Sequence, residues 1–190
     1  MKKLALVLVL LFVGSNILAQ DSKLSATLSY PLTIGDNFLN DYTGYIDVGL
    51  QYSFVNLEVV RFGVSANASF IGIPNPGIEG EKYSGTLIYP RVFGEFLLGR
   101  DGTFRPIAGL GYGINKFNST LDTTGAGFDT IKRNYEGLIL NIGASYDITS
   151  SIFVIAQYDW ANIDRSSSFV NNENFNNRGS LVKVGVGVRF

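Results

Sequence analysis

The chain has 190 residues, of which 16% are charged and 22 are glycine, and its formal net charge is −1. A net charge so close to zero excludes the basic footprint of a nucleic-acid-binding protein, and the absence of cysteine excludes disulfides, thiol nucleophiles and Cys-ligated zinc. Histidine is also absent, which removes the commonest general base and the commonest metal ligand. We therefore expect no catalytic residue, no metal site and no cofactor. The only enzyme chemistry left open is one built from Asp, Ser or Tyr.

Residues 1–19 predict a cleaved signal peptide. A pair of lysines follows the initiator methionine, an apolar run covers 4–13, and small residues lead to a cleavage site after Ala19. The apolar run is shorter than the roughly 20 residues that a transmembrane helix needs. We expect the mature chain, 20–190, to form a single domain.

Eight segments of the mature chain alternate apolar residues with polar or small ones, a period-2 pattern typical of β-strands. In chain order, the predicted strands cover residues 24–32, 45–54, 59–71, 87–98, 104–116, 135–146, 152–161 and 181–190. The last strand is the most regular, since its valines occupy every second position and the series ends at Phe190. The seventh is the least regular, because Phe153 and Ile155 share the parity of Gln157 and Asp159.

The predicted connections alternate between long and short. The long connections cover about 35–44, 72–85, 117–134 and 162–180. The remaining connections are short turns, one of which carries the hairpin signal Asp101-Gly102. In an up-and-down meander, all the long loops then lie on one rim, and the short turns and both termini lie on the other. This asymmetry, the even strand number and strands near the 9–11 residues that cross a bilayer predict an all-β fold, an eight-stranded antiparallel up-and-down transmembrane β-barrel.

The charged residues indicate which face of this barrel meets lipid. The apolar parity carries no charge away from the strand ends, whereas the opposite parity carries Asp47, Arg61, Arg91, Glu95, Arg105, Asp159, Lys183 and Arg189. A charge facing lipid at mid-bilayer costs about 2–4 kcal/mol, so these side chains should point inward, where glycines of the same parity leave room for them. We expect them to form an interior ionic network that plugs the barrel. The alternative is a narrow, gated conductance.

Aromatic residues gather near both ends of the predicted strands, where outer-membrane barrels carry interfacial girdles. Those near the short turns are Tyr52, Phe54, Phe96, Phe104, Tyr146 and Phe190, and those near the long loops are Phe70, Phe117, Tyr135 and Trp160. The alternative explanation is that aromatic residues simply favour strands.

Three stretches resemble the small eight-stranded outer-membrane barrels typified by the OmpA transmembrane domain and OmpX: 87–96 (LIYPRVFGEF), 104–115 (FRPIAGLGYGIN) and 184–190 (VGVGVRF). The resemblance implies a place in the bacterial outer membrane with periplasmic termini, contact with outer-membrane lipid and lipopolysaccharide, and an interior of ionic pairs without a wide pore. It also implies that the terminal Phe190 is the assembly signal read by the barrel-assembly machinery.

The remaining motifs point to no ligand. Gly109, Gly111 and Gly113 lie on one strand face and open no helix, so they predict no nucleotide site. Long loops on a rigid scaffold are where binding residues gather. We therefore expect a non-enzymatic structural or surface-interaction role through the long extracellular loops. The alternative is a narrow channel, or an accessory barrel of a transport, secretion or assembly complex with another envelope protein as its partner.

Overall fold

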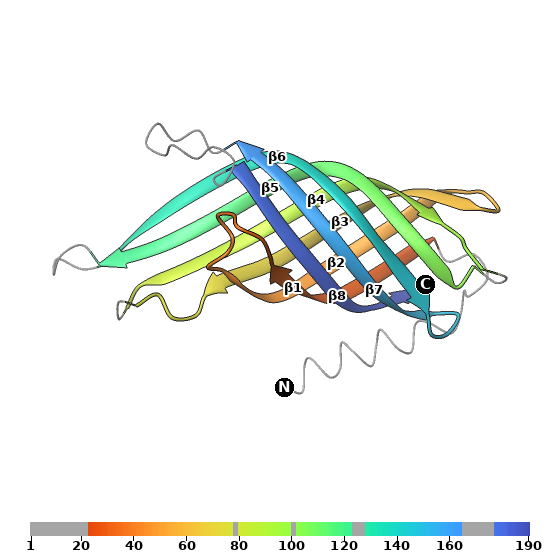
Figure 1. Cartoon of the computed structure of the whole chain (residues 1–190), viewed down its shortest axis with the longest axis horizontal. Coiled ribbons are helices and arrows are strands. Elements are labelled where there is room, and N and C mark those ends of the chain that lie inside the picture. The colour runs from red at the N-terminus through yellow and green to blue at the C-terminus, as the bar shows by residue number, and fades with distance from the viewer. Residues whose placement is uncertain (1–22, 78–79, 100–101, 123–127, 165–176) are drawn as a thin grey trace.

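The computed structural model describes residues 23–77, 80–99, 102–122, 128–164 and 177–190. The predicted signal peptide, 1–19, lies outside the described residues. The described chain forms a closed barrel in which each strand pairs antiparallel with the next and β8 pairs back onto β1 (Figure 1). Its strands are β1 (Leu24–Thr33), β2 (Thr43–Asn56), β3 (Val60–Ile73), β4 (Lys82–Phe96), β5 (Phe104–Asp122), β6 (Phe128–Asp147), β7 (Ile152–Asp164) and β8 (Arg178–Arg189). The predicted eight-stranded antiparallel up-and-down barrel is confirmed.

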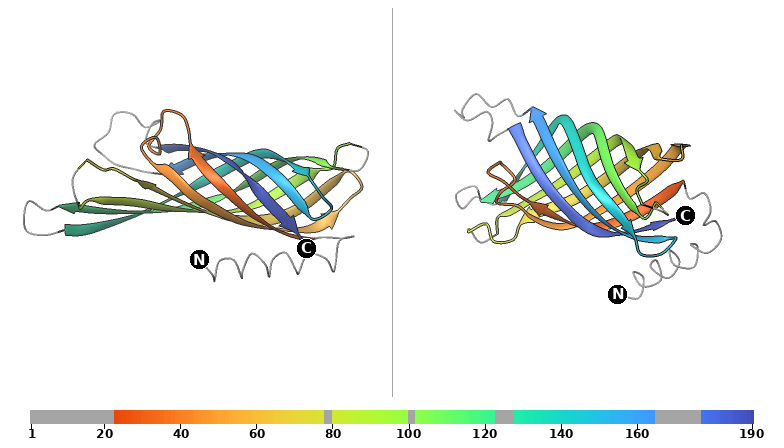
Figure 2. Two further views of the ribbon diagram at one scale, coloured as in Figure 1. Left: turned by 90° about the horizontal axis from the view of Figure 1, so that it is seen from below. Right: turned by 45° about the vertical axis from the view of Figure 1, so that its right-hand side comes forward.

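The predicted loop 117–134 is wrong, because most of it continues the two strands beside it. β5 and β6 stay in register out to the pair Asp122↔Phe128, and Figure 2 shows this hairpin projecting beyond the other strands. The pairing of β6 with β7 ends at Glu136↔Asp164, so the outer part of β6 is paired with β5 alone. Cross-strand threonines support the extension, since the hydroxyls of Thr120 and Thr130 lie 3.2 Å apart.

The outward face of the barrel is apolar all the way round. Every strand carries exposed aliphatic residues on this face, among them Leu28, Val48, Val64, Val92, Leu110, Leu140, Val154 and Val186. A belt of this extent is far larger than the apolar patches that water-soluble monomers expose, so its solvent is lipid. The irregular seventh strand follows the same rule, because Phe153 and Ile155 are buried inside the barrel.

The aromatic residues follow the predicted girdles only in part. Those near the short turns, Tyr52, Phe54, Phe96, Phe104 and Tyr146, are exposed on the outer face. At the long-loop end, Phe70 is exposed, but Phe117 is only 6% exposed and belongs with the half-buried Tyr135 to the interior. Both residues have the inward parity of their strands, so placing them in the outer girdle was wrong.

Glycine is required where β8 closes onto β1. A Cβ added at the inward-facing Gly185 would lie 2.2 Å from the carbonyl oxygen of Leu28. We expect Gly185→Ala to destabilise the barrel by about 1–3 kcal/mol through overpacking, measured by urea unfolding in detergent micelles. Gly94 is the control, since a Cβ there would meet only the ring of Phe62, at 3.3 Å. Equal losses at the two glycines would contradict this account of the seam.

Candidate functional site

Four charged residues meet at the middle of the barrel interior: Asp47 on β2, Arg91 on β4, Asp159 on β7 and Lys183 on β8. We call them the central quartet. Arg91 Nη1 donates to Asp159 Oδ1 over 2.7 Å, and Lys183 Nζ lies 2.7 Å from Asp159 Oδ2 and 3.5 Å from Asp47 Oδ2. Their side chains are at most 1% exposed. Two cations and two anions make the quartet neutral, which limits the cost of burying charge.

Amides and hydroxyls complete the shell of the central quartet. Asn67 Nδ2 and Ser69 Oγ donate to the two oxygens of Asp47, over 2.8 and 2.5 Å, and Asn67 Oδ1 accepts from Arg91. Asn141 Nδ2 donates to Asp159 Oδ1 over 2.6 Å. The contact between Lys183 and Asp159 is close but lacks hydrogen-bond geometry, so it acts as an ion pair. Charged groups held in this way are fixed as well as neutralised.

A second neutral group, the short-turn quartet, closes the end of the interior that lies beside the short turns. It consists of Glu95, Arg105, Asp147 and Arg189. Arg105 lies 2.6 Å from Asp147 and 3.6 Å from Glu95, while Arg189 contacts Asp147 and lies 3.8 Å from Glu95. The guanidinium of Arg189 also stacks over the ring of Phe153, 4.0 Å from its centroid.

Sequence reasoning missed Asp147 and misplaced Arg61. The strand predicted over 135–146 ends one residue before Asp147, although the odd number of Asp147 on β6 gives it the inward parity of Asn141. Arg61 has the inward parity but lies at the rim, half-buried, where its Nε donates to Asn56 Oδ1 over 2.9 Å. The terminal Phe190 is anchored by its backbone N–H, which donates to the carbonyl of Leu24 over 2.9 Å.

Apolar side chains form layers that alternate with the two quartets. Phe93, Ile107, Phe153 and Ile155 make one cluster, and a larger cluster contains Leu39, Ile71, Leu87, Tyr89, Phe117, Ile139, Ala161, Ile163 and Leu181. Inward residues along β4 show the order: Glu95, Phe93, Arg91, Tyr89 and Leu87 run from the short turns towards the long loops. Ionic and apolar layers therefore alternate, and almost none of their side-chain surface is accessible to water.

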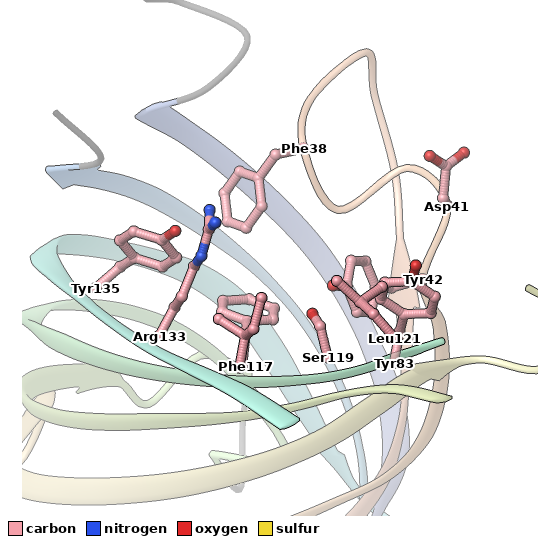
Figure 3. Close-up of a pocket in the computed structure, with 10 residues that line it drawn as sticks. Phe38, Asp41, Tyr42, Tyr83, Phe117, Ser119, Leu121, Arg133 and Tyr135 are labelled. Atoms are coloured by element: carbon pink, nitrogen blue, oxygen red, sulfur yellow. The ribbon is translucent and has the colours of Figure 1, made fainter. Parts of the chain in front are cut away.

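A cavity of about 440 Å³, the mouth pocket, lies above the larger apolar cluster at the long-loop end (Figure 3). The β1–β2 connection folds over it, because Leu39 is buried in that cluster and Asn37 holds the turn through Ile34 and Leu39. The extended β5–β6 hairpin supplies the opposite wall. The lining residues are Phe38, Asp41, Tyr42, Tyr83, Phe117, Ser119, Leu121, Ile131, Arg133 and Tyr135.

Aromatic rings dominate the mouth pocket. The Phe117 ring is the hub, with centroids 5.8 Å from Phe38, 5.5 Å from Tyr42 and 6.0 Å from Tyr135. The phenol of Tyr83 donates a 3.0 Å hydrogen bond to Glu81. The pocket therefore offers ring faces, neutral hydroxyls and the two charges of Asp41 and Arg133.

Across the described ranges of the chain, no three acidic side chains are placed to hold a metal ion. No helix in that same part of the chain is long and apolar enough to cross a membrane.

Comparison with known proteins agrees with this architecture. No curated protein matches the chain at a significant level. Similar solved structures are Ail, the attachment invasion locus protein of Yersinia pestis, in complex with the heparin analogue sucrose octasulfate (14% identity, TM-score 0.58, covering 88% of this chain and 96% of that one), Neisserial surface protein A (17%, 0.54, 88% and 96%), and the N-terminal β-barrel domain of Pseudomonas aeruginosa OprF (14%, 0.53, 90% and 100%).

At such identities these structures show a shared fold alone. The family evidence is separate: residues 5–190 match the family model described as outer membrane protein beta-barrel domain. The chain is therefore a bacterial outer-membrane protein and belongs to the outer membrane protein β-barrel domain family.

Proposed function

We propose that this protein is a non-enzymatic, non-conducting barrel that acts at the cell surface through its long-loop rim. The layered interior is the observation that carries the proposal. Ions need a continuous water-filled path, whereas the central quartet binds its charges to one another and lies between two apolar clusters. A plug of this kind stabilises the wall and leaves the rim as the place for function.

The shape of the rim supports the same role. The β5–β6 hairpin stands beyond its neighbours and, with the β1–β2 connection, forms a built recess instead of a featureless edge. Two of the similar structures are of proteins whose names describe attachment or a surface location, and one of them holds a heparin analogue. Surface recognition by this chain is our inference from its own rim. The absence of histidine from the sequence favours a non-enzymatic role.

The interior predicts the electrical behaviour of the protein. Reconstituted into planar lipid bilayers, the full barrel should give no stable large conductance, because the buried quartets and apolar clusters exclude water from the axis. Protein-free bilayers treated with the same detergent are the control. A steady nanosiemens-scale open state would contradict the plug and favour the alternative, a channel.

Surface binding is tested by shortening the hairpin. Replacing residues 119–131 by Asn-Gly should leave a two-residue hairpin, since Asn118 pairs with Lys132 in register. In nanodiscs, the full barrel should bind immobilised lipopolysaccharide or heparin, and the shortened barrel should bind at least about tenfold more weakly, which corresponds to 1.4 kcal/mol. Circular dichroism checks that the shortened barrel is folded. Absence of binding by the full barrel, or equal binding by both, would contradict the proposed role of the rim.

A further inference from the structure

We propose that the mouth pocket binds an acidic saccharide unit, that is, a sugar ring that carries a carboxylate. This inference rests on the proposed surface role and names the chemistry that the rim recognises. It is carried by the juxtaposition of an aromatic cluster, several hydroxyls and the guanidinium of Arg133 in one recess of the outer mouth.

The aromatic cluster suits a sugar ring. A pyranose has one face of C–H bonds, which is apolar, and a perimeter of hydroxyls, which is polar. The rings around Phe117 meet edge to face at interplanar angles of 75° and 64°, so neighbouring rings present both faces and edges to the cavity. Tyr42, Tyr83 and Ser119 place hydroxyls on the same lining.

The charges of the pocket favour an anion at the end lined by Phe38 and Tyr135. Figure 3 shows the guanidinium of Arg133 beside the rings of Phe38 and Tyr135, whereas the carboxylate of Asp41 lies at the other side of the cavity and points away from those rings. A planar guanidinium binds a carboxylate through two parallel hydrogen bonds. The same guanidinium would repel a cationic ligand, even though aromatic cages otherwise suit cations.

The dimensions of the mouth pocket indicate a closed binding site and not a channel through the barrel. A cavity of about 440 Å³ lies within the 300–1,000 Å³ range of small-molecule sites and accommodates one sugar ring with part of its neighbour. Its floor is the larger apolar cluster, with Leu87 and Ile139 fully buried, and the central quartet lies below that. A ligand that enters from the long-loop side therefore stops in the pocket.

The test uses the full barrel in nanodiscs and saturation-transfer NMR with three probes: D-glucuronate, D-glucose and benzoate. Glucuronate should bind saturably, whereas glucose lacks the carboxylate and benzoate lacks the hydroxyls, so each should bind at least about fivefold more weakly. Arg133→Gln should weaken glucuronate binding about tenfold or more and leave glucose unchanged. Arg133→Lys should restore part of the loss, because it returns the charge without the planar fork.

Lys132→Gln is the matched control. Lys132 is the neighbouring exposed cation on β6, with the opposite parity, and it does not line the pocket. The Lys132→Gln variant should bind glucuronate as tightly as the unchanged barrel. Equal losses in the Lys132 and Arg133 variants would overturn the site in favour of a diffuse surface charge, and benzoate binding as tightly as glucuronate would overturn the saccharide.

Two further outcomes separate this inference from the proposed function. If the full barrel binds a polysaccharide through the hairpin but binds no glucuronate, the pocket proposal fails and the surface role stands. If the full barrel binds neither the polysaccharide nor glucuronate, the pocket proposal and the surface role both fail. The source of the saccharide is resolved by competition, since free glucuronate and immobilised acidic polysaccharide should displace each other from a shared pocket.

Discussion

Asp159→Asn is expected to destabilise the barrel by about 3–5 kcal/mol, the usual cost of removing one partner from a buried ion pair. Asp159 is the one member of the central quartet that contacts both cations at 2.7 Å. Without its charge, Asp47, which lies 3.5 Å from Lys183, is the only anion left in the central quartet. The interior then carries one uncompensated positive charge between two apolar layers. Urea unfolding in detergent micelles, followed by tryptophan fluorescence, measures the loss.

A second substitution distinguishes charge balance from shape. In the double variant Asp159→Asn with Lys183→Met the quartet is neutral again, and we expect it to recover at least half of the stability that the single variant loses. Asp129→Asn is the control, since that carboxylate is exposed on the outer part of β6 and should change stability by less than about 0.5 kcal/mol. A double variant less stable than Asp159→Asn alone would show that Lys183 acts by packing and not by charge.

Parity is the part of this structure that could be predicted from the sequence. Period-2 alternation identified the barrel and placed Asp47, Arg91 and Lys183 on the face that the structure buries. Parity is informative because a charge that faces lipid is costly, so each strand inside the membrane keeps its apolar residues on one face and its charged residues on the other. Asp147 and Phe117 were missed only because the predicted strands were stopped too early. The same parity, continued by a few residues, would have placed both inside.

Two features could not be predicted. The contact between Arg91 and Asp159 joins residues 68 positions apart on β4 and β7, and such contacts across the lumen depend on the stagger of the closed sheet, which no single strand encodes. The sequence predicts a loop in place of the outer hairpin, because strands beyond the membrane have no lipid to face. Lys116 and Lys132 show the consequence, since exposed cations occupy the face that is apolar lower on the same strands. Alternation disappears there although the hydrogen-bonded ladder continues.

The lipid-facing belt predicts the other large effect. Ile142 on β6 is 60% exposed, and it follows Asn141, whose amide contacts the central quartet, so it lies near the middle of the barrel wall. Its register neighbours on the outer face are Ala108 and Tyr158. Ile142→Arg should therefore destabilise the barrel by about 2–4 kcal/mol in phospholipid vesicles, the cost of an arginine facing lipid at mid-bilayer.

Leu57→Arg provides the comparison for this experiment. Leu57 is 53% exposed, almost as much as Ile142, but it lies in the turn between β2 and β3, outside the belt. Because the arginine would be hydrated there, we expect a change within about 0.5 kcal/mol. The two positions differ in their depth in the bilayer and hardly in their exposure. The difference between the two losses of stability therefore reports whether lipid or water surrounds Ile142. In water, an arginine at Ile142 would cost no more than one at Leu57, and equal effects in vesicles would mean that this belt does not face hydrocarbon.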